Sequence, residues 1–119
     1  MSSVVPYLIR AYCDWIEESG LTPHILVDCE KAGVVVPKGL VNKGKIVLNV
    51  SSSATENRLI TNDSISFIAR FSGKPQKIII PCKAVLTIYA KENGEGMFFG
   101  NKSETKGDKN DKPNLTILD

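Results

Sequence analysis

The sequence has little excess charge of either sign. Its 15 basic and 13 acidic residues give a net charge of +2 over 119 residues, and the basic residues stand singly among acids. Proteins that bind nucleic-acid phosphates usually gather Lys and Arg into a cluster or stripe. The charge pattern therefore argues against a nucleic-acid partner and is typical of a solvated surface. The length is that of about one domain.

Cysteine and histidine are also scarce. Cys13, Cys29 and Cys82 lie far apart in the sequence, and His24 is the one histidine. Such isolated residues predict neither a disulfide framework nor a metal site, and we expect no cofactor. Reduced cysteines fit a cytoplasmic protein. We interpret His24 as a structural residue at the start of a strand.

Long apolar runs and catalytic motifs are missing as well. No basic region precedes an apolar stretch and a cleavage site, and no apolar run approaches the roughly 18 residues of a membrane span. No phosphate-binding glycine loop or Gly-x-Ser-x-Gly motif occurs. We therefore expect a soluble protein without membrane contacts that binds a partner rather than catalysing a reaction. A hydrolase whose active site has no recognised motif is a minor alternative.

A helix is the first element that the sequence does predict. Pro6 suits its first turn and Gly20 suits its end. At about 100° per residue, the apolar residues cover roughly two-thirds of the circumference. So wide an arc suits a deeply buried helix or, as we favour, a helix that also packs on a second subunit in a homodimer. The arc consists of Tyr7, Leu8, Ile9, Ala11, Tyr12, Cys13, Trp15 and Ile16.

Short β-branched runs separated by turn residues follow the helix. Runs at this spacing predict a mainly β fold, either a small barrel or a sandwich. The expected turns are Lys43–Gly44, residues 72–75 and Asn93–Gly94. The expected strands are His24–Asp28, Val34–Val36, Lys45–Val50, Arg58–Ile60, Ser64–Phe71, Lys77–Ile80 and Val85–Ala90.

The strand Ser64–Phe71 shows the clearest alternation. Phe67, Ala69 and Phe71 share one face, and the small Ala69 leaves a notch between two phenylalanines. In a core, this notch would accept a neighbouring side chain. On a surface, it would accept a ligand chain.

The composition changes abruptly after Phe99. Residues 100–114 contain no aliphatic or aromatic residue, which predicts disorder. Apolar residues return within Lys112–Asp119, as in a docking motif on a polar tether, although a frayed end or a last strand has the same pattern. We expect a domain at 1–99, a flexible linker at 100–111 and a docking motif at 112–119.

Several segments resemble the stringent starvation protein B (SspB) family, in the same order and at nearly the same spacing between about Pro6 and Phe99. The resemblance implies an Sm-like small β-barrel behind an N-terminal helix that forms a dimer interface, with Tyr7 and Ala11 at the contact. The matching segments are residues 7–11, 21–24, 36–37, 46–50, 67–71 and 84–97.

The same resemblance implies a function. SspB proteins are adaptors that bind the ssrA tag of stalled translation products and deliver tagged chains to the ClpXP protease. In the family the tag lies extended in an apolar groove, a binding mode in which pockets for alternate side chains give specificity. We expect groove residues at Val47, Phe67, Ala69, Arg70 and Phe71, with Arg70 opposite an acidic residue of the tag.

The tail also resembles the family, whose tails end in a motif that docks on the zinc-containing N-terminal domain of ClpX. Lys112, Pro113, Leu115, Ile117 and Leu118 match this motif, whereas Asp119 stands in place of a basic residue. A linker of about 12 residues has a root-mean-square reach of roughly 20 Å and a ceiling of about 40 Å. The fold alone also permits an Sm-like RNA-binding module, which is the alternative to the adaptor.

Overall fold

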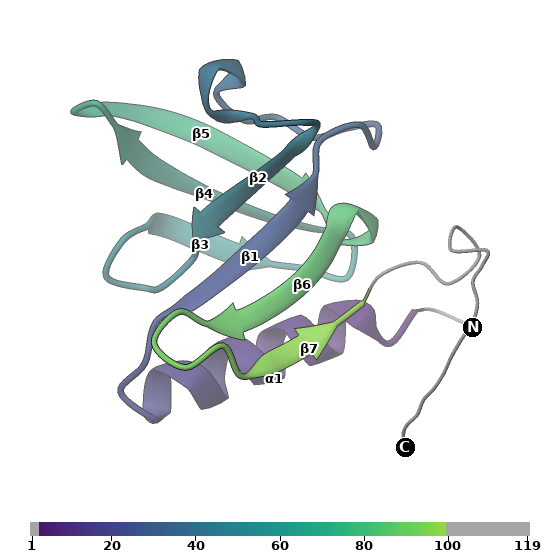
Figure 1. Ribbon diagram of the computed structural model, residues 1–119, viewed down its shortest axis with the longest axis vertical. Coiled ribbons are helices and arrows are strands. Elements are labelled where there is room, and N and C mark those ends of the chain that lie inside the picture. The colour runs from purple at the N-terminus through teal and green to yellow at the C-terminus, as the bar shows by residue number, and fades with distance from the viewer. Residues whose placement is uncertain (1–2, 100–119) are drawn as a thin grey trace.

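One helix and two antiparallel sheets make up residues 3–99, the part of the chain that the computed structural model describes (Figure 1). The helix α1 spans Val5–Glu18, and two short 3-10 turns, η1 and η2, span Lys38–Leu40 and Cys82–Ala84. The strands are β1 (Pro23–Asp28), β2 (Lys45–Asn49), β3 (Glu56–Ile60), β4 (Ser64–Phe71), β5 (Lys74–Pro81), β6 (Val85–Ala90) and β7 (Gly96–Phe98).

The predicted helix is confirmed. Pro6 occupies its first turn, where the missing N–H costs no helical hydrogen bond. Gly20 ends it with a φ of 79°, and the Leu21 N–H donates to the Ile16 carbonyl oxygen at 3.0 Å. Ile9, Cys13 and Ile16 are buried against the sheets, and α1 packs on β1, β6 and η2. One side of the apolar arc thus completes the core.

The first sheet has four strands in the order β2-β1-β6-β7. Burial alternates along β1, where Ile25 and Val27 face inward. β7 was not predicted because it is only three residues long and pairs with β6 alone. A Cβ atom at Gly96 would overlap the carbonyl oxygen of Ile88, so only glycine permits the close approach of these two backbones.

The second sheet has three strands in the order β3-β4-β5. β4 and β5 form a hairpin whose turn residues, Ser72 and Gly73, have φ angles of 56° and 80°. The predicted strand Val34–Val36 is wrong as a strand: only Val35 pairs, through an isolated bridge to Ile79 of β5. Gly33 and Pro37 flank this segment and keep it short.

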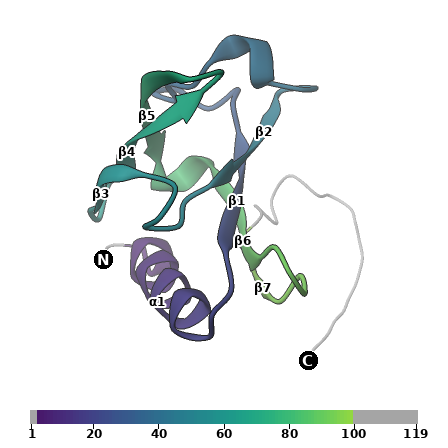
Figure 2. The ribbon, with the colours of Figure 1, turned by 90° about the vertical axis from the view of Figure 1, so that its left-hand side faces the viewer.

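The two sheets face each other and enclose the core, and α1 lies across one end (Figure 2). The two-sheet alternative to a barrel is therefore confirmed, and in residues 3–99 no ladder joins β2 to β3 to close a barrel. Each sheet contributes alternate residues to the core, as the period of two requires. The buried residues include Ile25, Val27, Ile46, Leu48, Ile65, Phe67, Ile78, Ile80, Val85 and Ile88.

Candidate functional site

Three of the predicted groove residues lie on the inner face of β4. Phe67 is 1% exposed and packs within the core, whereas Ala69 is 9% exposed and Phe71 is only half-buried. Accessibility therefore increases along β4 towards the hairpin turn. The structure confirms that these side chains share a face, and it places Ala69 at the border between core and surface.

The other two predicted groove residues lie on outer faces. Val47 of β2 is 50% exposed while its neighbours Ile46 and Leu48 point into the core. Arg70 is exposed on the outer face of β4, and its Nη1 donates to the Gly73 carbonyl oxygen at 3.3 Å. The side chains of Val47 and Arg70 are thus not brought onto the face that carries Ala69.

The backbone of β2 nevertheless faces an open side of the molecule. The Val50 N–H donates to the Pro23 carbonyl oxygen at 3.0 Å, and the Cys29 N–H donates to that of Gly44 at 2.7 Å. Because ladder bonds recur at every second residue, the even-numbered residues of β2 point their backbone groups at β1. The N–H and C=O groups of Val47 therefore point away from β1, towards the unpaired edge of the sheet.

The end of β4 also extends beyond its partner. The ladder between β3 and β4 ends at the pair Glu56 and Ile68, so residues 69–71 have a neighbour only in β5. A pocket of about 200 Å³ lies against this extension, lined by Ile68, Arg70, Pro75 and residues 53–56. Six residues connect β2 to β3. We call the region bounded by β2 and residues 69–71 the β2–β4 seam.

Basic residues surround the end of the molecule at which β2 begins and the β4–β5 hairpin turns, opposite α1 (Figure 1). The exposed acids Asp14, Glu18, Glu92 and Glu95 lie on α1 and on the β6–β7 turn, whereas Glu30 and Glu56 are exposed near the basic residues. The excess of basic residues at the hairpin end favours the approach of acidic chains. The exposed basic residues there are Lys38, Lys43, Lys45, Arg70, Lys74 and Lys77.

The outward face of α1 is a second candidate surface. Tyr7 and Trp15 are each 49% exposed, and Ala11 between them is exposed as well. Tyr12 and Trp15 meet edge to face with their ring centroids 5.6 Å apart, and a pocket of about 340 Å³ lies between them and Ala11. Half of the predicted apolar arc is therefore uncovered in the single chain.

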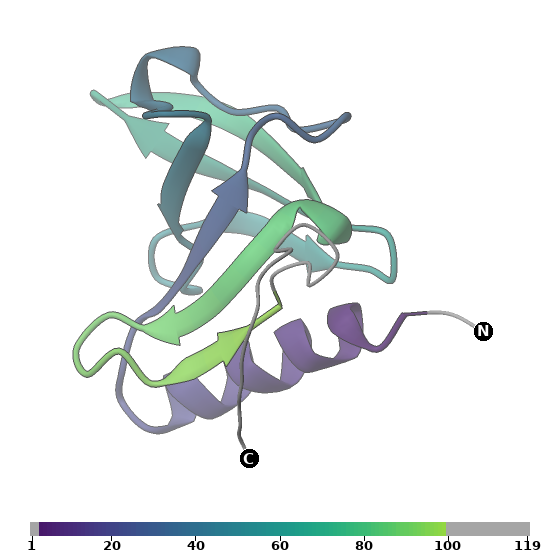
Figure 3. The ribbon, with the colours of Figure 1, turned by 45° about the vertical axis from the view of Figure 1, so that its right-hand side comes forward.

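Polar contacts hold α1 in this orientation. Arg10 donates to the Ile60 carbonyl oxygen at 3.1 Å and lies 4.8 Å from the centre of the Tyr7 ring. Glu17 accepts hydrogen bonds from the Ser52 N–H and from Arg58. These contacts join both ends of α1 to β3 and to the segment before it. The helix α1 lies beside β7 (Figure 3), and Trp15 lines a pocket with Asn93 and Glu95 of the β6–β7 turn.

Residues 3–99 offer little for chemistry. They contain no group of three His, Cys, Asp or Glu side chains that could hold a metal ion. His24 lies beside Tyr89, with ring centroids 5.9 Å apart. Burial raises the pKa of the Cys82 thiol and raises that of Cys13 to about 11, so both thiols are kept protonated at neutral pH. None of the helices in these residues is long and apolar enough to cross a bilayer.

The residues predicted to dock on a partner lie outside the described residues, as do the predicted linker 100–111 and motif 112–119. They are Lys112, Pro113, Leu115, Ile117 and Leu118. The contacts that they make stay predictions.

The described residues form a small β domain with an open strand edge and a partly exposed apolar face, features that can accept an extended chain. The family model described as "Stringent starvation protein B" matches residues 3–116, and the chain belongs to this family. It is also similar to the stringent starvation protein B homolog of Haemophilus influenzae, with 51% identity over 94 residues. These residues are 79% of this chain and 63% of that relative, so the chain spans less than two-thirds of the relative's length.

Two features of the site were missed by sequence reasoning. The unpaired backbone of Val47 depends on which strands pair across the gap between β2 and β3, and side-chain periodicity carries no signal for that. Trp15 was placed on the helical arc, but its exposure beside Ala11 was not predicted. Its spacing of four residues from Ala11 was the available signal.

Proposed function

We propose that the protein is a proteolytic adaptor that binds an extended ssrA-type degradation tag in the β2–β4 seam and tethers the tagged chain to ClpXP. The proposal rests on the family and on one observation above all: β2 has an unpaired edge, and residues 69–71 of β4 have no neighbour on the β3 side. An extended peptide placed there adds its backbone to the sheet edge and offers alternate side chains to the Ala69 notch.

The predicted groove residues have distinct parts in this proposal. Val47 contributes the backbone N–H and C=O groups that point to the unpaired edge of the sheet. Ala69 and Phe71 form the apolar notch. Phe67 supports the notch from within the core. Arg70 and the basic residues around the hairpin attract the Asp and Glu residues of the tag, and this attraction weakens as salt is added.

We further propose that two copies associate through the outward face of α1. An exposed cluster of Tyr7, Ala11 and Trp15 on a helix held in place by Arg10 and Glu17 is the kind of apolar patch that marks an interface. A twofold axis would bring the same patch of each copy together. The dimer then carries two tag sites and two tails.

The tail supplies the second half of the mechanism. Residues 112–119 are proposed to dock on the N-terminal domain of ClpX, so that a bound tag is held near the unfoldase. Joining two modest interactions through a linker raises the overall affinity by roughly 10²–10⁴-fold without new contacts. The adaptor itself catalyses nothing in this scheme, and it acts in the cytoplasm.

Fluorescence anisotropy of a labelled ssrA-tag peptide, titrated with the full chain, tests the proposal. We expect saturable binding that a scrambled peptide of the same composition does not show, and weaker binding as salt is raised. Equal binding of both peptides would show that the interaction depends on peptide charge and not on the tag sequence. Absence of binding by a folded protein would overturn the assignment of the seam and make single-stranded RNA the next ligand to test.

A further inference from the structure

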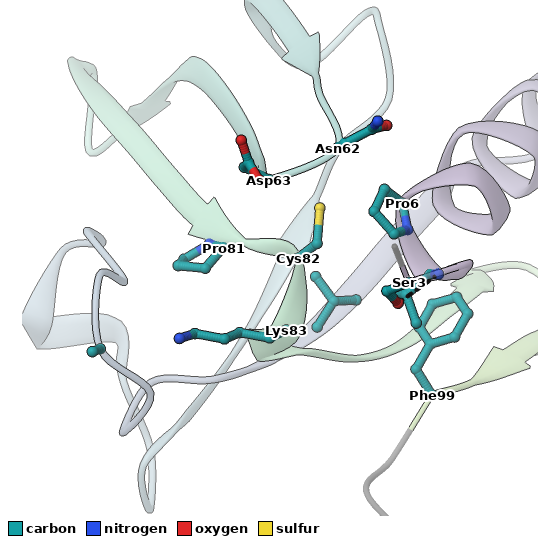
Figure 4. A pocket seen from close by; sticks show the side chains of 11 residues that line it. Ser3, Pro6, Asn62, Asp63, Pro81, Cys82, Lys83 and Phe99 are labelled. Carbon is teal, nitrogen blue, oxygen red and sulfur yellow. Dashed lines mark hydrogen bonds between the residues drawn. The ribbon is translucent and has the colours of Figure 1, made fainter. Parts of the chain in front are cut away.

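A large pocket lies away from the β2–β4 seam and has no part in the proposed adaptor function. Its volume is about 790 Å³, and it lies where the start of α1, the turn before β4 and η2 meet (Figure 4). Its floor is apolar, since Pro6, Cys82 and Val85 are all buried. A concave apolar site with a few polar groups at its rim is the usual form of a binding site.

The rim of this pocket carries charges of both signs. Asp63 and Lys83 are exposed on opposite sides of Cys82, and neither forms an ion pair with another residue in the range 3–99 (Figure 4). The backbone beneath them is ordered by hydrogen bonds, because the Cys82 N–H donates to the Asp63 carbonyl oxygen at 2.9 Å. The pocket therefore has an apolar floor and a rim that carries one acidic and one basic side chain on an ordered backbone.

The last described residue of the chain lies at this pocket. Phe99 forms one wall and is anchored by its N–H, which donates to the Leu86 carbonyl oxygen at 2.6 Å. The next apolar residues in the sequence are Leu115, Ile117 and Leu118, and they stand between a base, Lys112, and an acid, Asp119. The order of charge and apolar groups in this segment matches that of the pocket.

From these observations we propose that the pocket binds residues 112–119 of the same chain. Fifteen residues separate Phe99 from Leu115, and such a segment can extend to about 50 Å, far more than a return to the pocket requires. A tethered segment has an effective concentration in the millimolar range, so even weak docking fills the pocket. Leu115, Ile117 and Leu118 enter the apolar floor, and Lys112 lies near Asp63.

The docked segment cannot contact another protein through the same three apolar side chains. The pocket therefore acts as an internal competitor for the segment that we propose to dock on ClpX, and it lowers the apparent affinity for that partner in proportion to its occupancy. This inference does not depend on the tag site, and it can be tested without tag or unfoldase.

Amide ¹H–¹⁵N spectra of the full chain provide the test. Replacing Leu115, Ile117 and Leu118 together by serine should shift the amides of Ala32, Lys83 and Phe99 at the pocket by more than a line width. A control chain with Asn101, Thr105 and Asn110 replaced by serine should leave them unchanged. Pocket amides that do not respond to the first set of substitutions overturn the proposal.

A second variant probes the rim. Asp63→Lys should move the amides of residues 112–119 towards their positions in the free peptide, whereas Glu95→Lys makes the same charge change on the distant β6–β7 turn and should not. The shifts should persist on dilution by an order of magnitude. Shifts that disappear on dilution would show that the segment comes from another molecule, which contradicts docking within one chain.

Discussion

Ala69 is the residue on which the proposed specificity depends. It lies on the same face as two phenylalanines, and its 9% exposure places it at the edge of the core rather than inside it. Its partner across the ladder is Gln76 of β5. A larger side chain at position 69 would extend from this border into the space that the proposed peptide occupies.

We predict that Ala69→Gln abolishes tag binding while the domain stays folded. The added amide fills the notch, and overpacking at this mostly buried position costs about 1–3 kcal/mol of unfolding free energy. Peptide anisotropy together with a thermal unfolding curve checks both parts. Ala32→Gln adds the same atoms to an exposed alanine and should bind normally. A folded Ala69→Gln chain with full affinity would exclude this residue from the site.

The buried thiol of Cys13 makes the free energy of unfolding decrease at alkaline pH. Burial raises the pKa of its thiol from 9.0 in the unfolded chain to about 11 in the folded one. Between these values the unfolded chain loses a proton that the folded chain keeps, so unfolding becomes easier as pH rises. A shift of this size corresponds to about 2–3 kcal/mol once the pH exceeds both pKa values.

Urea unfolding at pH 8 and at pH 10.5 measures this effect. The loss of unfolding free energy between the two pH values should be smaller in Cys13→Ala than in the unchanged chain. Cys29→Ala, which removes a far less buried thiol, should retain most of the loss. An identical loss in all three chains would assign the alkaline destabilisation to other groups.

At the scale of elements, α1 has two apolar sides with different roles. Ile9, Cys13 and Ile16 are no more than 1% exposed and stabilise the chain's own core. Tyr7 and Trp15 are half exposed, although their aromatic rings could stabilise a fold considerably if buried. In the proposed dimer, a second copy of the helix would cover this side.

We predict that Ala11→Asp converts the dimer into a folded monomer. Two aspartates would be brought together without water at the twofold contact, whereas in the monomer the same side chain is solvated. Light scattering coupled to size-exclusion chromatography should give half the mass, with an unchanged circular dichroism spectrum. Asp14→Asn, on the polar side of α1, should leave the measured mass at that of the dimer. A wild-type chain that is monomeric at all concentrations would refute the dimer itself.

How much of each element was predictable depended on its length and pattern. β4 was predicted to the residue because Ser64–Phe71 alternates over eight positions, and the end of β6 because charged residues and Asn93–Gly94 follow Ala90. β7 was missed because its three residues form a strand only through β6. Of the candidate site, periodicity correctly grouped Phe67, Ala69 and Phe71. It could not reveal the unpaired edge of β2, which depends on tertiary pairing.

For the whole molecule, binding and delivery should be separable. We predict that deleting residues 112–119 leaves tag affinity unchanged and removes the stimulation of ClpXP, because the domain at 1–99 retains the seam but loses the proposed tether. Degradation of a tagged fluorescent protein at a concentration below its own affinity for the protease measures delivery. Replacing Asn101, Thr105 and Asn110 by serine keeps the docking segment and should deliver normally. Undiminished delivery by the truncated chain contradicts the tethering mechanism.

The unpaired edge of β2 has a consequence for how this family could change its clients. In the proposed binding mode, backbone groups such as those of Val47 would accept any extended chain equally well, so the edge would supply attraction without discrimination. Discrimination then rests with the few side chains beside it, chiefly the small residue at position 69. A lineage could therefore acquire a new set of substrates by exchanging one or two side chains at the border of the core, while the architecture that captures the peptide backbone stays the same.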